Sequence, residues 1–321
     1  MMSDSATEMR AIAPPAAEEP RRAAPTIDDR PASTCPDSGI GLPAGGRRTI
    51  RRFLSNRAGS AALAFLLAIV AIAFCAPWLY PDDPLSMVAQ PFLWPGQNAE
   101  FPLGTDSLGR DVAAGIVWGA RVSLLVGFAA MALGVAFGVF VGSVAGFFGG
   151  RIDNGLLRLT EIFQTMPSFI LLVVLVAIAQ PSIPTIILGI SLVTWPTVAR
   201  LVRAEFRSLK EKEFVVAARS LGAGSLRLIA FHILPNTISP IIVTSSILVA
   251  SAILMESALS FLGLGDPNLV SWGSMIGSGR ELLRTAWYLT AIPGLAIILT
   301  VLALNIAGDA LNDALNPRAP D

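Results

Sequence analysis

Few residues of this chain are suited to chemistry, and their spacing does not match the common reaction centres. His232 is the single histidine, and it has no second histidine or cysteine with which to complete a metal site. Neither of the two lysines, Lys210 and Lys212, follows a glycine, so the Gly-Lys-Ser/Thr of a phosphate-binding loop is absent. Gly222 and Gly224 lack the third glycine and the preceding strand of a dinucleotide fingerprint, and there is no G-x-S-x-G motif. We therefore expect no catalytic residue, metal or cofactor, and any ATP chemistry in another subunit.

Other ionisable residues of interest lie in or beside apolar stretches. Glu256 is near the outer end of one stretch, where a carboxylate usually faces a bundle interior or an aqueous path. It is either a pathway or gate residue, or a hydrogen-bonded packing residue at a helix end. Asp153, Arg158 and Glu161 precede another stretch. Because Arg158 and Glu161 are three residues apart on one helix face, we expect an interfacial ion-pair patch here.

The polar segment from Glu213 to Pro235 predicts two short helices joined by a sharp turn, which we call the elbow. Gly222 and Gly224 should end the first helix, because glycine takes left-handed backbone angles at no steric cost. Ser225 should be the N-cap of the second helix. The first helix should show one apolar face between charged residues, with i, i+3, i+4 and i+7 spacing, formed by Phe214, Ala217, Ala218 and Leu221.

The composition is that of a membrane protein. Of the 321 residues, 53% are hydrophobic and 14% are charged, and the mean hydropathy is +0.64, far above that of a soluble protein. Residues 1–46 differ, because they contain seven prolines and few large apolar residues, and we expect them to be disordered. The apolar run that begins at Ala58 lies far from the N-terminus, so we interpret it as a retained span rather than a signal peptide.

Uncharged runs long enough to cross a bilayer predict six transmembrane helices. The run 162–199 is long enough for two, and its proline-containing break at 180–184 is the expected turn. Beyond the first 46 residues, fifteen Lys and Arg lie on the side of the termini and the elbow, and four on the other side. This asymmetry predicts cytoplasmic termini, with 82–120 and 263–284 outside. The runs are 58–81, 122–150, 162–199, 228–255 and 285–308.

Glycine recurs every four residues in the second span. This spacing places the glycines along one helix face, where the absent side chains let another helix approach closely. We interpret this ladder as a packing surface rather than a site of chemistry. Its members are Gly134, Gly138, Gly142, Gly146 and Gly150.

Several motifs make residues 51–318 similar to a known family. Besides the elbow, they are FPLGTDSLGRD (101–111), GARVSL (119–124), ESALSFLGLG (256–265), SWG (271–273) and NIAGDALNDALNP (305–317). The chain resembles the permease subunits of bacterial ABC importers of the dipeptide, oligopeptide and nickel family, and among these the second, C-type permease. The resemblance implies an all-α polytopic membrane protein with six transmembrane helices and the type I ABC importer permease fold.

In that family the elbow forms the coupling helices, which dock on the ATP-binding subunit. The family pattern is E-A-A, three residues, Gly, nine residues and I-x-L-P. This chain departs from it at Val216, which replaces the Glu, and at His232, which replaces the Ile. Glu213, one helical turn earlier, offers a similar charge. The residues expected to serve ATPase coupling are Glu213, Ala217, Ala218, Gly222, Gly224, His232, Leu234 and Pro235.

The resemblance also implies an organisation and a function. It implies a disordered cytoplasmic tail (1–46), a first transmembrane helix with an external segment (47–118), a permease domain (119–309) with coupling helices at 205–232, and a cytoplasmic tail (310–321). The chain would be a non-catalytic inner-membrane subunit that passes dipeptides or oligopeptides. Its expected partners are a second homologous permease, two ABC ATPases, an extracytoplasmic substrate-binding protein and membrane lipid, with no nucleic acid. The alternatives are a cargo of nickel, glutathione or another small solute, and, from a different class, an intramembrane hydrolase.

Overall fold

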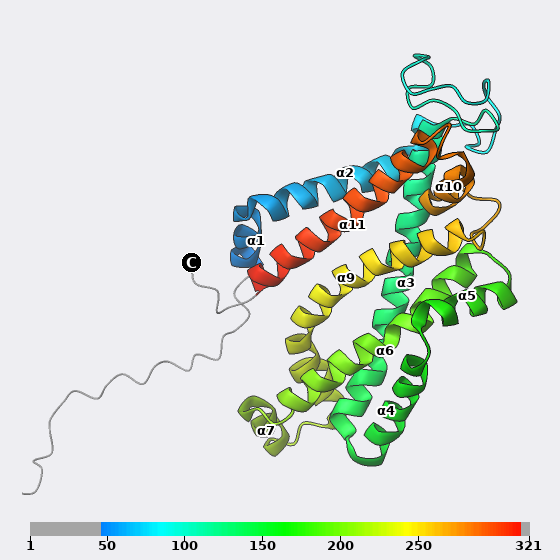
Figure 1. Cartoon of the computed structure of the whole chain (residues 1–321). Coiled ribbons are helices and arrows are strands. Elements are labelled where there is room, and N and C mark those ends of the chain that lie inside the picture. Colours follow the sequence, from blue (N-terminus) through cyan, green and yellow to red (C-terminus); the bar gives the residue numbers. More distant parts are fainter. Residues whose placement is uncertain (1–45, 316–321) are drawn as a thin grey trace, which may run out of the picture. The chain divides into compact units, whose positions relative to one another are not determined.

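The computed structural model describes residues 46–315, where the secondary structure is helical apart from one isolated bridge between Thr105 and Asp111. The expected disordered tail therefore falls outside the described residues, except for Gly46. The elements, most of them labelled in Figure 1, are α1 (Gly46–Ser55), α2 (Arg57–Leu79), α3 (Val112–Phe148), α4 (Gly150–Thr165), α5 (Ser168–Ala179), α6 (Ile183–Leu209), α7 (Glu213–Ser220), α8 (Ser225–Arg227), the π-helix η1 (Leu228–Ile233), α9 (Leu234–Phe261), α10 (Trp272–Gly279), the 3-10 helix η2 (Arg280–Leu282) and α11 (Tyr288–Leu315).

Five described helices are long and apolar enough to cross a membrane: α2, α3, α6, α11, and α9 together with the residues from Ser225 that lead into it. α4 and α5 pass the same test as a pair, but they are bent by 83° at the break between them. The all-α prediction is confirmed. The six predicted crossings result when the bent pair forms one broken span, and five result when it forms a re-entrant loop.

Met166 and Pro167 account for the break between α4 and α5. A proline ring disfavours the helical conformation of the residue before it, and Met166 is indeed extended, with ψ of 138°. Pro167 is then the N-cap residue of α5. The turn expected at 180–184 is also found: α5 ends at Ala179, and the Ser182 hydroxyl accepts a hydrogen bond from the Thr185 amide (3.4 Å) at the start of α6.

Several helices extend beyond the predicted runs, among them α3, α6, which ends at Leu209 rather than 199, α9, which ends at Phe261 rather than 255, and α11. α3 begins at Val112 rather than 122, because the Asp111 carboxylate accepts a hydrogen bond from the Ala113 amide (2.8 Å) and caps the helix there. Arg121 interrupts the uncharged run without interrupting the helix. α11 continues to Leu315, so the first residues of the predicted C-terminal tail are helical.

α3 is the central helix, and it packs along α6 and against α2 and α9 (Figure 1). Glycines permit the close approach to α6: a Cβ on Gly138 would lie 2.6 Å from the Val198 Cβ, and one on Gly142 would lie 2.5 Å from the Ala199 carbonyl oxygen. Gly150 does not belong to this contact, because it begins α4 and a Cβ there would meet nothing within 4 Å. Gly134 and Gly146 come similarly close to Thr194 and Phe206.

Two buried aromatic residues tie the 80–111 segment and α10 to the long helices. The Trp272 indole at the start of α10 donates a hydrogen bond to the Ile116 carbonyl of α3 (3.0 Å). The Tyr288 hydroxyl at the start of α11 donates to the Thr105 carbonyl (2.8 Å). Because both side chains are 1% exposed, these bonds fix the loops at this end of the molecule to the helices.

Candidate functional site

The elbow forms a sharp turn at the end of α6 away from the 80–111 segment (Figure 1). At the end of α7, the Ala223 amide donates to the Ala218 carbonyl (3.1 Å) and the Gly222 amide donates to the Arg219 carbonyl (3.0 Å). This pair of bonds is the Schellman motif, which requires a left-handed residue between helix and turn. Gly222 supplies it, with φ of +86°. Gly224 has an ordinary extended conformation, with φ of −68°.

The predicted apolar face of α7 only partly coincides with the face that packs on the core: Phe214 and Ala218 are half-buried there, and Ala217 is exposed. Val215 is fully buried, and it belongs to a cluster with Phe206 of α6 and Leu228 and Ile233 of η1. Leu221, the last residue of the predicted apolar face, is 89% exposed. The i, i+3, i+4, i+7 spacing did not identify Val215, because α7 and the turn also carry apolar residues that are not part of the core.

Three large apolar side chains of the elbow point away from the core. Leu221, Leu226 and Phe231 are exposed by 89%, 81% and 76%. We call these three residues the elbow patch. They lie at the end of α7, in α8 and in η1, so the short segment that changes direction carries all of them. An apolar group of this kind beside charged residues is typical of a surface that another protein covers.

The second half of the elbow is continuous with the fifth span. Gly224, not Ser225, is the N-cap residue of α8, and it makes no side-chain cap. Ser225 is already helical, so its predicted capping role is wrong. η1 carries His232, whose Nδ1 lies 3.3 Å from the Arg227 carbonyl oxygen, and α9 then begins with Leu234 and Pro235. A π-segment inserts an extra residue per turn, which rotates the following side chains relative to a plain α-helix.

A partly buried ion pair joins α4 to α6, and its arginine differs from the expected one. Asp153 of α4 accepts two hydrogen bonds from Arg203 of α6, one of them 2.8 Å from Nη2 to Oδ2, and Arg207 is 4.0 Å away. Within residues 46–315 no ion pair joins Arg158 to Glu161. Helical spacing could not identify Arg203, because it is brought to Asp153 by the packing of two separate helices.

Glu256 is enclosed near the C-terminal end of α9. Its carboxylate accepts hydrogen bonds from the hydroxyl of Ser260 (2.7 Å) and from that of Ser123 of α3 (3.0 Å). The residue is 1% exposed. In the described part of the chain no Lys or Arg forms an ion pair with it, so hydroxyl groups alone stabilise this carboxylate. Sequence analysis singled out Glu256 but not Ser123, its partner on another helix.

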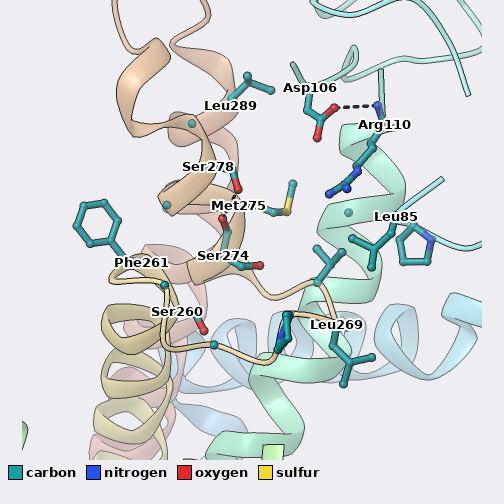
Figure 2. Close-up of a pocket in the computed structure, with 18 of the residues that line it drawn as sticks. Leu85, Asp106, Arg110, Ser260, Phe261, Leu269, Ser274, Met275, Ser278 and Leu289 are labelled. Carbon is teal, nitrogen blue, oxygen red and sulfur yellow. Dashed lines mark hydrogen bonds between the residues drawn. The ribbon is translucent and has the colours of Figure 1, made fainter. Parts of the chain in front are cut away.

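A pocket of about 390 Å³ adjoins this carboxylate site, since Ser260 lines it. We call it the external pocket, after the side on which the loop charges predict it to lie. Its walls come from the 84–115 region, the α9–α10 loop, α10 and the start of α11 (Figure 2). The Asp111 carboxyl, which lines it, has a pKa raised by burial, although the amides of Ala113 and Ala114 oppose that shift. No sequence pattern pointed to this pocket, because its residues are distant in the chain.

Comparison with known proteins shows which family has this architecture. Residues 138–320 match the family described as binding-protein-dependent transport system inner membrane component. Residues 46–99 match the N-terminal TM domain of oligopeptide transport permease C. The MetNI methionine ABC transporter, in a structure of its inward-facing conformations, superposes with a TM-score of 0.53, at 18% identity over 63% of this chain and 96% of that one. That likeness shows the type I importer fold.

Curated relatives cover most of this chain and of their own length. The di/tripeptide transport system permease protein DppC of Pseudomonas aeruginosa is 38% identical, over 83% of this chain and 90% of its own. The glutathione transport system permease protein GsiD of Pectobacterium atrosepticum is 36% identical, over 84% of this chain and 89% of its own. Because residues 138–320 match the family and relatives are 36–38% identical over most of the chain, the chain belongs to the family of binding-protein-dependent transport system inner membrane components.

Proposed function

We propose that this chain is the C-type permease subunit of an ATP-driven importer that passes dipeptides or oligopeptides across the cytoplasmic membrane. The observation that carries the proposal is the 36–38% identity to permeases named for dipeptide transport, over more than four-fifths of this chain. The subunit is non-catalytic. It works with a second, homologous permease, two ATPases and an external binding protein, which is the composition implied by its family.

The elbow is the contact with the ATPase. The elbow patch supports this role, because its three exposed apolar side chains would be covered by a partner while Val215 and its neighbours hold α7 against α6. Glu213, at the exposed start of α7, contributes charge, and Ala217, also exposed, allows close approach. His232, Leu234 and Pro235 carry the connection from the elbow into α9, so movement of the elbow would be passed to the fifth span.

Glu256 acts at the external gate. Its hydrogen bonds join α9 to α3, and it lies next to the external pocket. A gate at this end must change the contacts between these helices when cargo enters. The bonds to hydroxyl groups are suited to such a change, because a hydroxyl can rotate to a new partner.

The orientation follows from the charge asymmetry of the loops. Both termini and the elbow face the cytoplasm, and the external pocket faces the binding protein. Glutathione is the second candidate cargo, because the permease named for its transport is 36% identical to this chain.

The deciding experiment is uptake in proteoliposomes that contain the complete complex and its binding protein. Labelled dipeptides, tripeptides and glutathione are supplied with ATP inside the vesicles. ATP-dependent accumulation of the dipeptide or tripeptide is expected. Accumulation of glutathione alone would favour the second candidate, and no accumulation of any of them would refute the proposed cargo class.

A further inference from the structure

The external pocket contains a half-buried arginine, Arg110, whose Nε is buried without a partner. Arg110 precedes the first turn of α3, and Figure 2 shows its side chain directed into the pocket toward Met275 of α10. Its Nε is buried and forms no hydrogen bond. In the described part of the chain its guanidinium has no ion pair either. A guanidinium group in that position is ready to bind an anionic ligand group, because its donors form a fixed fork.

The carboxylates that line the same pocket are already engaged with backbone amides. Asp106 accepts from the amides of Leu108 and Arg110, both at 2.8 Å, and the second of these bonds is drawn in Figure 2. Asp266 accepts from the amides of Asn268 (3.0 Å) and Ile183 (3.3 Å). Asp111 is held by the Ala113 amide. These three carboxylates therefore shape the loops, and Arg110 is left to meet a ligand.

The rest of the pocket favours an apolar group beside the anion. Leu85, Phe261, Leu269, Met275 and Leu289 line it together with the polar residues. Its volume of about 390 Å³ falls within the ~300–1,000 Å³ typical of small-ligand sites. The pocket thus combines Arg110, an apolar wall and room for a molecule of two or three residues, while Arg280, its other cationic lining residue, lies 4.0 Å from Glu281 and donates to the Phe261 carbonyl (3.3 Å).

We propose that this pocket is a binding site for the terminal carboxylate of a short peptide whose last residue is apolar, with Arg110 as the carboxylate-binding residue. The ligand class of this site follows from the proposed function. The site adds to that function a place on this subunit where cargo is held at the external surface. Bidentate hydrogen bonds from the guanidinium to both carboxylate oxygens would give the site its selectivity for a free C-terminus.

The test measures peptide binding to the complete complex in lipid nanodiscs, without ATP and without the binding protein. The probes are Ala-Leu and Ala-Leu amide, which differ only in the terminal charge. Ala-Leu is expected to bind the wild-type complex roughly tenfold or more tightly than its amide, because hydrogen bonds between charged groups are the stronger ones. Arg110→Gln should weaken Ala-Leu binding by a similar factor and leave amide binding unchanged. Arg110→Lys should give an intermediate loss, since it keeps the charge but not the fork.

The matched control is Arg284→Gln, which removes an exposed arginine of the same external side that does not line the pocket. It should bind Ala-Leu as the wild type does. Equal affinity for the two probes on the wild-type complex, or no binding of Ala-Leu at millimolar concentration, would overturn the site without relying on any variant. So would an Arg110→Gln variant that binds Ala-Leu as the wild type does and, in a separate docking assay, loses only the binding protein, because Arg110 would then contact a carboxylate of that protein. If any of these results is accompanied by normal peptide uptake by the wild-type complex, only the pocket proposal fails and the proposed function stands. If the wild-type complex takes up no peptide, the proposed function itself is refuted.

Discussion

Arg203 of α6 holds Asp153 of α4 through two parallel hydrogen bonds, the Nη2 to Oδ2 bond being 2.8 Å long. The aspartate side chain is 9% exposed and the arginine 21%. This pair fastens α4, the amphipathic first helix of the bent pair, to the helix that leads directly into the elbow. A force applied at the elbow would therefore reach α4 as well as α6.

Replacing Asp153 should loosen that connection. Asp153→Asn removes the charge that both guanidinium hydrogen bonds use, and we expect a loss of about 2 kcal/mol of stability. Thermal unfolding of the purified complex measures it. Glu161→Gln on the exposed part of α4 is the control and should melt with the wild type. Equal melting of the two variants would show that the pair contributes nothing.

Gly138 should tolerate no side chain. The added Cβ in Gly138→Ala would lie 2.6 Å from the Val198 Cβ and 2.8 Å from the Trp195 carbonyl oxygen, so α3 and α6 must separate. Overpacking of this kind costs about 1–3 kcal/mol. Gly155→Ala on α4 meets nothing within 4 Å and should be neutral or mildly stabilising. Yield and melting temperature of the two variants, compared side by side, decide the point, and a fully stable Gly138→Ala would contradict it.

Gly222→Val should uncouple the elbow without preventing membrane insertion. The new side chain has open space, but the φ of +86° is unfavourable for a β-branched residue by at least about 1–2 kcal/mol. Gly224→Val also meets nothing within 4 Å, and its extended backbone suits valine. Binding-protein-stimulated ATPase activity and peptide uptake should both fall in the first variant and persist in the second. If the two variants behave alike, the left-handed turn is not what coupling needs.

Glu256→Gln should keep the complex assembled and change uptake, because the shape is retained and the carboxylate that bridges α3 and α9 is lost. Glu256→Leu should instead lower the yield of complex, since the hydroxyls of Ser123 and Ser260 lose an acceptor, at about 1–3 kcal/mol for an unsatisfied buried group. Uptake is measured at matched complex levels. Glu281→Gln, at an exposed external carboxylate, is the control. Wild-type uptake by Glu256→Gln would rule out a charge-dependent gate.

The orientation can be tested with single cysteines at Ser107 and Ser225 in a chain whose own Cys35 and Cys75 are replaced. An impermeant thiol reagent added outside intact cells should label only the first position, because the charge asymmetry places the elbow in the cytoplasm. Permeabilised cells should give labelling of both, which confirms that Ser225 is accessible. External labelling of Ser225 alone would invert the proposed topology.

The local sequence predicts most of the helices of this protein but not where they begin and end. An apolar run must form a helix in a bilayer to satisfy its own backbone, so composition alone indicates the spans. The local sequence also indicates the turn at 180–184 and the sharp turn at Gly222, since proline restricts the backbone and glycine permits left-handed angles. The start of α3 at Val112 was missed because a capping aspartate, not an uncharged run, decides where that helix begins.

Contacts between distant segments were beyond any local pattern. The spacing of the ladder marks a packing face, but only the tertiary structure identifies α6 as the helix that lies against it. In the same way, only the tertiary structure shows that Arg203 is the partner of Asp153 and that Ser123 is the partner of Glu256. It also shows that Val215 is buried whereas Leu221 is exposed. The sequence by itself thus determined the membrane class, the helices and the turns, because these depend on neighbouring residues. Which side chains meet across helices, and which pocket Arg110 enters, depended on how the helices pack, because packing brings together residues that the chain keeps apart.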